Sequence, residues 1–95
     1  MSALTSADVG AVLQRIASYD GRQVTTPDVV AWSELLAGSA VRPTVAELHA
    51  AARAWYETHS TYVRPAQLLQ QVRDARRRAM VNDVTAARLA GELEA

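Results

Sequence analysis

The stretch PTVAELHAAARAWYETHSTY, residues 43 to 62, decides the fold class of this chain. Thr44 and Glu47 form the Thr-x-x-Glu pattern of a capping box, in which each side chain accepts the backbone N–H of the other residue. After this cap, apolar side chains recur at steps of three and four residues as far as Trp55. That spacing is the period of an α-helix with one buried face. The sequence therefore predicts a helix over about residues 45 to 59, with Trp55 at the centre of the core.

Three further segments carry helix signals of the same kind. Thr5 can cap a helix that Gly21 would end, because glycine tolerates the left-handed conformation that closes many helices. Thr26 stands directly before Pro27, and Pro65 follows an arginine, so both prolines suit the first position of a helix. The sequence thus predicts helices over about residues 6 to 19, 27 to 37 and 65 to 80.

The remaining C-terminal residues have helical propensity but few large apolar side chains. Asn82 and Asp83 can interrupt a helix or cap a new one, and an interior glycine such as Gly91 costs about 1 kcal/mol relative to alanine. We expect a helical domain over residues 1 to 80 and a weakly docked C-terminal extension over residues 81 to 95.

No segment shows the alternating pattern of a strand, so the predicted fold class is all-α. A chain of 95 residues has room for one modest core. We expect a compact bundle of four main helices with a C-terminal helical extension. The expected core residues are the large apolar side chains on the helical stripes: Ile16, Trp32, Leu36, Leu48, Trp55, Leu68 and Val72.

Composition narrows the function classes. The chain has no cysteine, which excludes disulfides and thiolate metal sites, and its formal net charge is zero, which argues against non-specific nucleic-acid binding. It contains no apolar run of about 20 residues and no secretory signal pattern. We therefore expect a cytoplasmic protein without a membrane partner.

The residues that usually perform catalysis are scattered. His49 and His59 are too far apart on one helix for a metal site and have no cysteine or acidic cluster nearby. The acidic residues occur singly, and the glycines form no phosphate-binding loop. We expect no metal, no cofactor and no enzymatic activity.

The strongest candidate for a binding surface is basic. Between residues 64 and 78 there are five arginines and one aspartate. These arginines can bind a partner, or they can simply form a solvated helix end that complements the helix dipole. Two tyrosines near the end of the helix over 45 to 59 are further candidates for contact with a partner. The two tryptophans suit the core better than a surface on which bases stack. The expected partner-binding residues are Arg64, Arg73, Arg76, Arg77, Arg78, Tyr56 and Tyr62.

The order of these signals resembles that of the small phage replication proteins called helicase loader/inhibitors. The resemblance covers about Asp8 to Ala79. It is carried by an amphipathic helix ending at Tyr19, by Val29-x-x-Trp32-x-x-x-Leu36, by an alanine-rich helix through Ala51 and Trp55-Tyr56, and by Arg64-Pro65-x-x-Leu68-Leu69.

This resemblance implies a helical N-terminal domain and a C-terminal part that engages a hexameric replicative helicase and couples it to an initiator protein. It implies no cofactor and no catalysis. Arg73 to Ala95 would correspond to the helicase-facing part, although here that part is short, alanine-rich and helical in propensity. The residues that would determine the fold are Val29, Trp32, Leu36, Trp55 and Pro65.

We therefore expect a non-enzymatic phage or prophage adaptor that binds a replicative helicase and modulates its loading or its ATPase activity. One alternative is a small DNA-binding or transcription-regulating protein that uses the arginine-rich end of the helix over 65 to 80, because helix-turn-helix proteins share this size and class. DNA binding is the less favoured possibility. Another alternative is a phage inhibitor of a host protein that acts through Tyr56 and Tyr62.

Overall fold

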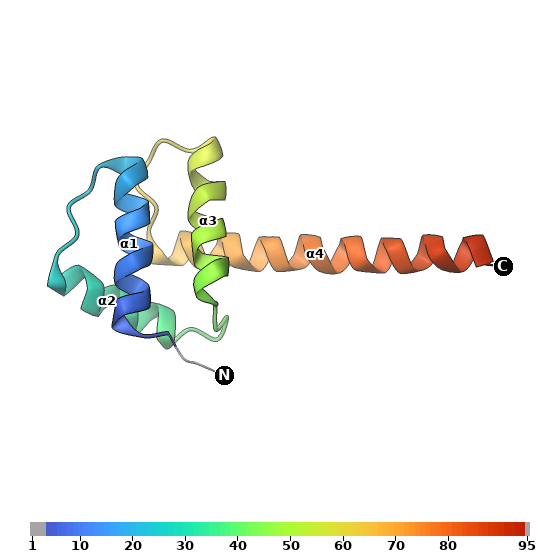
Figure 1. Ribbon diagram of the computed structural model, residues 1–95, viewed down its shortest axis with the longest axis horizontal. Coiled ribbons are helices and arrows are strands. Elements are labelled where there is room, and N and C mark those ends of the chain that lie inside the picture. The colour runs from blue at the N-terminus through green and yellow to red at the C-terminus, as the bar shows by residue number, and fades with distance from the viewer. Residues whose placement is uncertain (1–3, 95) are drawn as a thin grey trace.

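The structure is a computed structural model that describes the backbone of residues 4 to 94 and the side chains of residues 4 to 91. Over these residues the chain forms four helices and no strand, which confirms the all-α prediction. The helices in chain order are α1 (Ser6–Asp20), α2 (Thr26–Ala37), α3 (Val45–Thr58) and α4 (Pro65–Glu94) (Figure 1).

Helices α1 and α3 begin where the capping boxes predict. The hydroxyl of Thr5 accepts the N–H of Asp8, and the hydroxyl of Thr44 accepts the N–H of Glu47, both at 3.1 Å. In each pair the carboxylate accepts the threonine N–H at 3.0 Å. Gly21 closes α1 in the left-handed conformation, with φ 74°. These local bonds satisfy backbone donors that a helix start otherwise leaves unpaired.

Helix α2 begins one residue earlier than its proline predicts. Its N-cap is Thr25, whose hydroxyl accepts the N–H of Asp28 at 3.4 Å while the Asp28 carboxylate accepts the N–H of Thr25 at 3.0 Å. Thr26 is therefore the first helical residue, and Pro27 lies in the first turn. The reciprocal capping box, and not the position of the proline, sets the start of this helix.

Helix α4 departs most from the prediction. It does not end near Met80 but continues without a break to Glu94. Most residues from 76 to 89 are alanine, arginine or other good helix formers, so Asn82 and Asp83 do not interrupt the hydrogen-bond ladder. The C-terminal helical extension is thus the second half of one 30-residue helix.

Figure 1 shows α1 and α3 side by side, running in the same direction, with α4 crossing α3 and then continuing alone beyond the bundle. Helix α3 packs against both α1 and α4, and α2 packs against α1 and α4. The protruding helix makes the molecule elongated, with extents of 58 × 31 × 17 Å.

The core lies where the four helices meet. Of the seven expected core residues, Trp32 is the one that is only partly buried, because it packs against the edge of the core; the other six are buried. Helix α4 contributes Leu68 and Val72, which are 0% and 1% exposed. From Ala75 to Gly91 every residue of α4 is exposed. The first two turns of α4 therefore supply the side chains that this helix buries in the core.

Candidate functional site

The part of α4 beyond Arg76, residues 77 to 94, is called here the free half of α4. It carries Met80, Val81, Val84 and Leu89, whose exposed fractions are 66%, 56%, 63% and 54%. Large apolar side chains gathered on one exposed segment are more typical of an interaction surface than of a solvated one. The free half is therefore the main candidate for binding a partner.

Three of these residues and one alanine form a short apolar stripe. Met80, Val84 and Ala87 follow one another at steps of four and three, so they share one side of the helix, and Val81 flanks them. Asn82 lies on the opposite side. Such a stripe matches the anchors of an amphipathic helix that lies in a groove of another protein.

Exposed arginines stand at the base of the free half. Arg73, Arg77 and Arg78 are exposed on α4, and Arg64 is exposed just before it. Arg77 lies 4.0 Å from the carboxylate of Asp74, but its side chain is 73% exposed, so this contact leaves the guanidinium available to a partner. Arg73, Arg77 and Arg78, called here the basic turn, thus lie next to the apolar stripe.

Arg76 differs from its neighbours because its guanidinium is used inside the chain. It donates to both carboxylate oxygens of Glu47, from Nε at 2.6 Å and from Nη2 at 2.7 Å. Its Nη1 donates to the carbonyl of Val41 at 2.6 Å, and Nη2 donates also to the carbonyl of Arg42 at 3.2 Å. The hydrogen bonds from Arg76 lower the pKa of Glu47 from its usual 4.5 to about 2. Arg76 therefore ties α4 to the start of α3.

Tyr56 is likewise engaged within the bundle. Its hydroxyl donates to the carboxylate of Asp20 and accepts the N–H of Val63 at 3.0 Å and a guanidinium N–H of Arg22 at 3.3 Å. Partial burial, followed by the hydrogen bond to Asp20, raises the pKa of Tyr56. The hydroxyl of Tyr56 thus joins α3 to the connections before α2 and α4.

Arg22 is the centre of the same network. It donates to Asp20 from Nε at 2.8 Å and from Nη2 at 2.6 Å, and Nη2 also donates to the carbonyl of Val63 at 2.9 Å. Burial of Asp20 acts to raise its pKa, but the hydrogen bonds from Arg22 and Tyr56 outweigh burial and lower it. No sequence signal pointed to Arg22, because its partners Tyr56 and Val63 lie 34 and 41 residues away.

Tyr62 stays at the surface but covers this network. Its side chain is 59% exposed, and its ring centroid lies 5.1 Å from the guanidinium of Arg22. Trp32 lies on the same guanidinium at 5.6 Å. These contacts are cation–π interactions, which add modest stability at partly exposed sites. Among the two tyrosines expected to bind a partner, Tyr62 is the one with most of its surface available.

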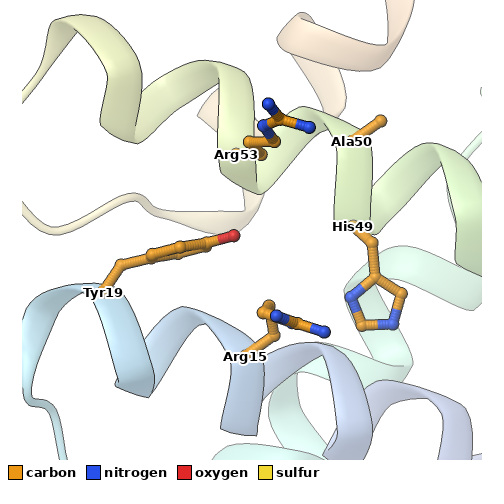
Figure 2. Close-up of a pocket in the computed structure, with 5 residues that line it drawn as sticks. All are labelled: Arg15, Tyr19, His49, Ala50 and Arg53. Carbon is orange, nitrogen blue, oxygen red and sulfur yellow. The ribbon is translucent and has the colours of Figure 1, made fainter.

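A separate depression of about 300 Å³ lies between α1 and α3 (Figure 2). Its lining includes two arginines, a tyrosine and a histidine. The residues are Arg15, Tyr19, His49, Ala50 and Arg53. The sequence alone does not predict this basic surface, because Arg15 and Arg53 are isolated along the chain and come together only when the two helices pack.

Among the side chains that the structure describes, those of residues 4 to 91, no three histidine, aspartate or glutamate side chains gather closely enough to hold a metal ion. None of the helices in that range is both long enough and apolar enough to cross a membrane. The fold and surfaces define a small all-α protein with one helix that leaves its bundle. No family model, curated protein or solved structure matches the chain.

Proposed function

We propose that this protein is a non-enzymatic adaptor of phage DNA replication that binds a hexameric replicative helicase in the cytoplasm and modulates its loading or its ATPase activity. The observation that carries the proposal is the free half of α4, which presents Met80, Val81 and Val84 on one side of the helix to solvent outside the bundle. The helicase binds this segment, while the bundle provides a rigid base for it.

The free half of α4 lacks the packing that usually stabilises a helix. Most helices in proteins gain their stability from packing one apolar face against the rest of the fold. Beyond Val72 no described residue of α4 is buried. A groove on a partner that receives Met80, Val84 and Ala87 would supply the missing packing.

The choice of a helicase as the partner is supported by the sequence resemblance to phage helicase loader/inhibitors. In that comparison Arg73 to Ala95 corresponds to the helicase-facing part, and this segment contains the free half of α4. A helical segment loses less conformational entropy on binding than a disordered tail does, because its backbone is already ordered. An initiator protein is the second partner that the resemblance implies.

A second candidate function is DNA binding, and the basic turn favours it. Arg64, Arg73, Arg77 and Arg78 are all exposed, so they are free to contact phosphates. The net charge of zero makes such binding weak unless the charge is concentrated at this turn. Inhibition of a host protein through the tyrosines has less support, because the hydroxyl of Tyr56 is used within the bundle.

The test is size-exclusion chromatography of the phage or host replicative helicase with variants of this protein. Full-length protein should co-elute with the helicase, and a variant that ends at residue 80 should not. Val84→Glu should also abolish co-elution, because it places a charge on the apolar stripe. Asn82→Glu adds the same charge on the other side of the helix and should leave the complex intact.

Two results together would contradict the proposal. One is the absence of co-elution with either helicase at protein concentrations well above those in the cell. The other is binding to duplex DNA whose affinity falls steeply with salt, which marks phosphate contacts by the arginines. The helicase ATPase rate, measured with and without the protein, then decides whether a complex activates or inhibits.

A further inference from the structure

The depression between α1 and α3 is built from two pairs of side chains. Arg15 and Tyr19 lie one helical turn apart on α1, and His49 and Arg53 lie one turn apart on α3. The two helices run in the same direction, so each residue of one pair stands across from a residue of the other (Figure 1, Figure 2). Four side chains with N–H or O–H groups therefore border one space.

The charge of this space is positive. Arg15 and Arg53 supply two guanidiniums, and none of the five lining residues is acidic. Arg15 makes no ion pair with any residue whose side chain the structure describes. Arg53 pairs with Glu57, whose carboxylate lies 3.4 Å from Nε of Arg53. Both of those side chains are more than half exposed, at 76% and 63%, so their attraction is weak and readily replaced by a stronger partner.

His49 adds an unsatisfied polar group. Its Nδ1 atom is shielded from solvent and has no hydrogen-bond partner among the described residues. Buried polar atoms in folded proteins nearly always have a partner, and those that lack one are frequently explained by a bound ion or water. A bound oxyanion can accept a hydrogen bond from Nδ1, in the tautomer that carries its proton there.

We propose that this depression binds a phosphate group, either as inorganic phosphate or at the end of a phosphomonoester. Two guanidiniums match the charge of a phosphate dianion, and four donor side chains match its several acceptor oxygens better than the two oxygens of a carboxylate. A volume of about 300 Å³ exceeds that of a bare phosphate and leaves room for the group that a phosphomonoester carries. The site lies on the α1 and α3 face, so it is independent of helicase binding through the free half of α4.

The experiment is an NMR titration of the full chain with inorganic phosphate at fixed pH and ionic strength. The chain contains two histidines, so their ring resonances are readily assigned. The His49 ring should shift and saturate. His59, which stacks on Trp55 with ring centroids 3.7 Å apart at the end of α3, should not move and serves as the internal reference. No saturable shift of His49 overturns the proposal.

Four single substitutions refine the test. Arg15→Gln and Arg53→Gln should each weaken phosphate binding by at least about tenfold, because each removes charge-assisted hydrogen bonds. Arg78→Gln removes an exposed arginine elsewhere and should leave the affinity unchanged. Glu57→Gln should tighten binding, because it frees Nε of Arg53. Thermal melts of each variant show whether the fold is kept, which the exposure of Arg15 and Arg53 leads us to expect.

Two further ligands test the source of the phosphate group and the chemical class of the ligand. A nucleoside monophosphate that binds more tightly than inorganic phosphate assigns the site to phosphomonoesters, and equal affinity assigns it to the phosphate group alone. Acetate tests the chemical class. If acetate shifts His49 with the same affinity as phosphate, the depression attracts any anion and the assignment to phosphate is overturned.

Discussion

Arg76 and Glu47 form a bidentate ion pair in which Nε and Nη2 of the guanidinium lie 2.6 and 2.7 Å from the two carboxylate oxygens. Glu47 also completes the capping box of α3 by accepting the N–H of Thr44. One carboxylate therefore fixes the start of α3 and attaches α4 to it. Substituting Arg76 together with its neighbours would change stability as well as binding, so tests of the basic turn should be confined to Arg73, Arg77 and Arg78.

This pair predicts an acid-dependent loss of stability. The pKa of Glu47 in the folded protein is about 2, below its usual 4.5, so the stabilisation is present above pH 4.5 and is lost as the pH falls towards 2. The urea midpoint should decrease across that interval. Arg76→Gln should make the decrease shallower, because the pKa of Glu47 then returns towards its usual value.

Some acid dependence should remain in Arg76→Gln, because the lowered pKa of Asp20 contributes stability of the same sign. Arg78→Gln is the matched control, and its midpoints should follow those of the wild-type protein. Identical pH profiles for the wild type and Arg76→Gln would show that the pair does not couple protonation to folding.

Tyr56→Phe should destabilise the protein by about 1 to 3 kcal/mol, because the substitution leaves the Val63 N–H and one lone pair of Asp20 without their partner. Tyr62→Phe also removes a phenolic hydroxyl, but that side chain is largely exposed and its ring contact with Arg22 survives. Urea unfolding of the two variants gives the comparison. Equal effects would mean that the network around Arg22 adds little to stability.

The two tryptophans should differ in their contribution to stability. Trp55 is 8% exposed, and its indole N–H donates to the carbonyl of Thr61 at 2.9 Å, so Trp55→Ala should cost about 3 to 5 kcal/mol. Trp32 lies at the edge of the core and should cost less when replaced by alanine. Chemical unfolding of both variants measures the order, and the reverse order would place the centre of the core near α2.

Removal of residues 81 to 95 should change the unfolding free energy by less than about 1 kcal/mol, the usual range for exposed positions. The described residues in that segment are all exposed, so little packing is lost. Circular dichroism should show less helix, with the thermal midpoint nearly unchanged. A large fall in the midpoint would show that this segment packs on the bundle in solution.

The start of each helix in the bundle could be predicted from the sequence to within about one residue, because caps are local. Thr44 and Glu47 are three residues apart, and their pattern contains all the atoms that form the bonds. Thr25 and Asp28 show the same pattern, and the neighbouring proline concealed it. Six of the seven expected core residues are buried, because helical periodicity predicts which face of a helix is apolar; Val41 and Val63 are buried in connections, where no such periodicity exists.

Contacts between distant segments could not be predicted in this way. Arg76 reaches Glu47 across 29 residues and Tyr56 reaches Asp20 across 36, and no local pattern distinguishes these side chains from exposed ones. The depression lined by Arg15 and Arg53 depends likewise on the packing of α1 against α3. The sequence predicts a separate extension from residue 81 because Asn82 and Asp83 have low helix propensity, whereas α4 continues through both residues to Glu94.

The length of α4 also has a mechanical consequence. From Val72, its last buried residue, to Glu94 the helix extends about 33 Å, at a rise of 1.5 Å per residue. It acts as a lever whose fulcrum is the pair of turns seated in the core. A tilt of about 10° at the fulcrum would displace the tip by about 6 Å, roughly one helical turn. Small adjustments where Arg76 meets Glu47 would thus be magnified into large changes in where the far end points.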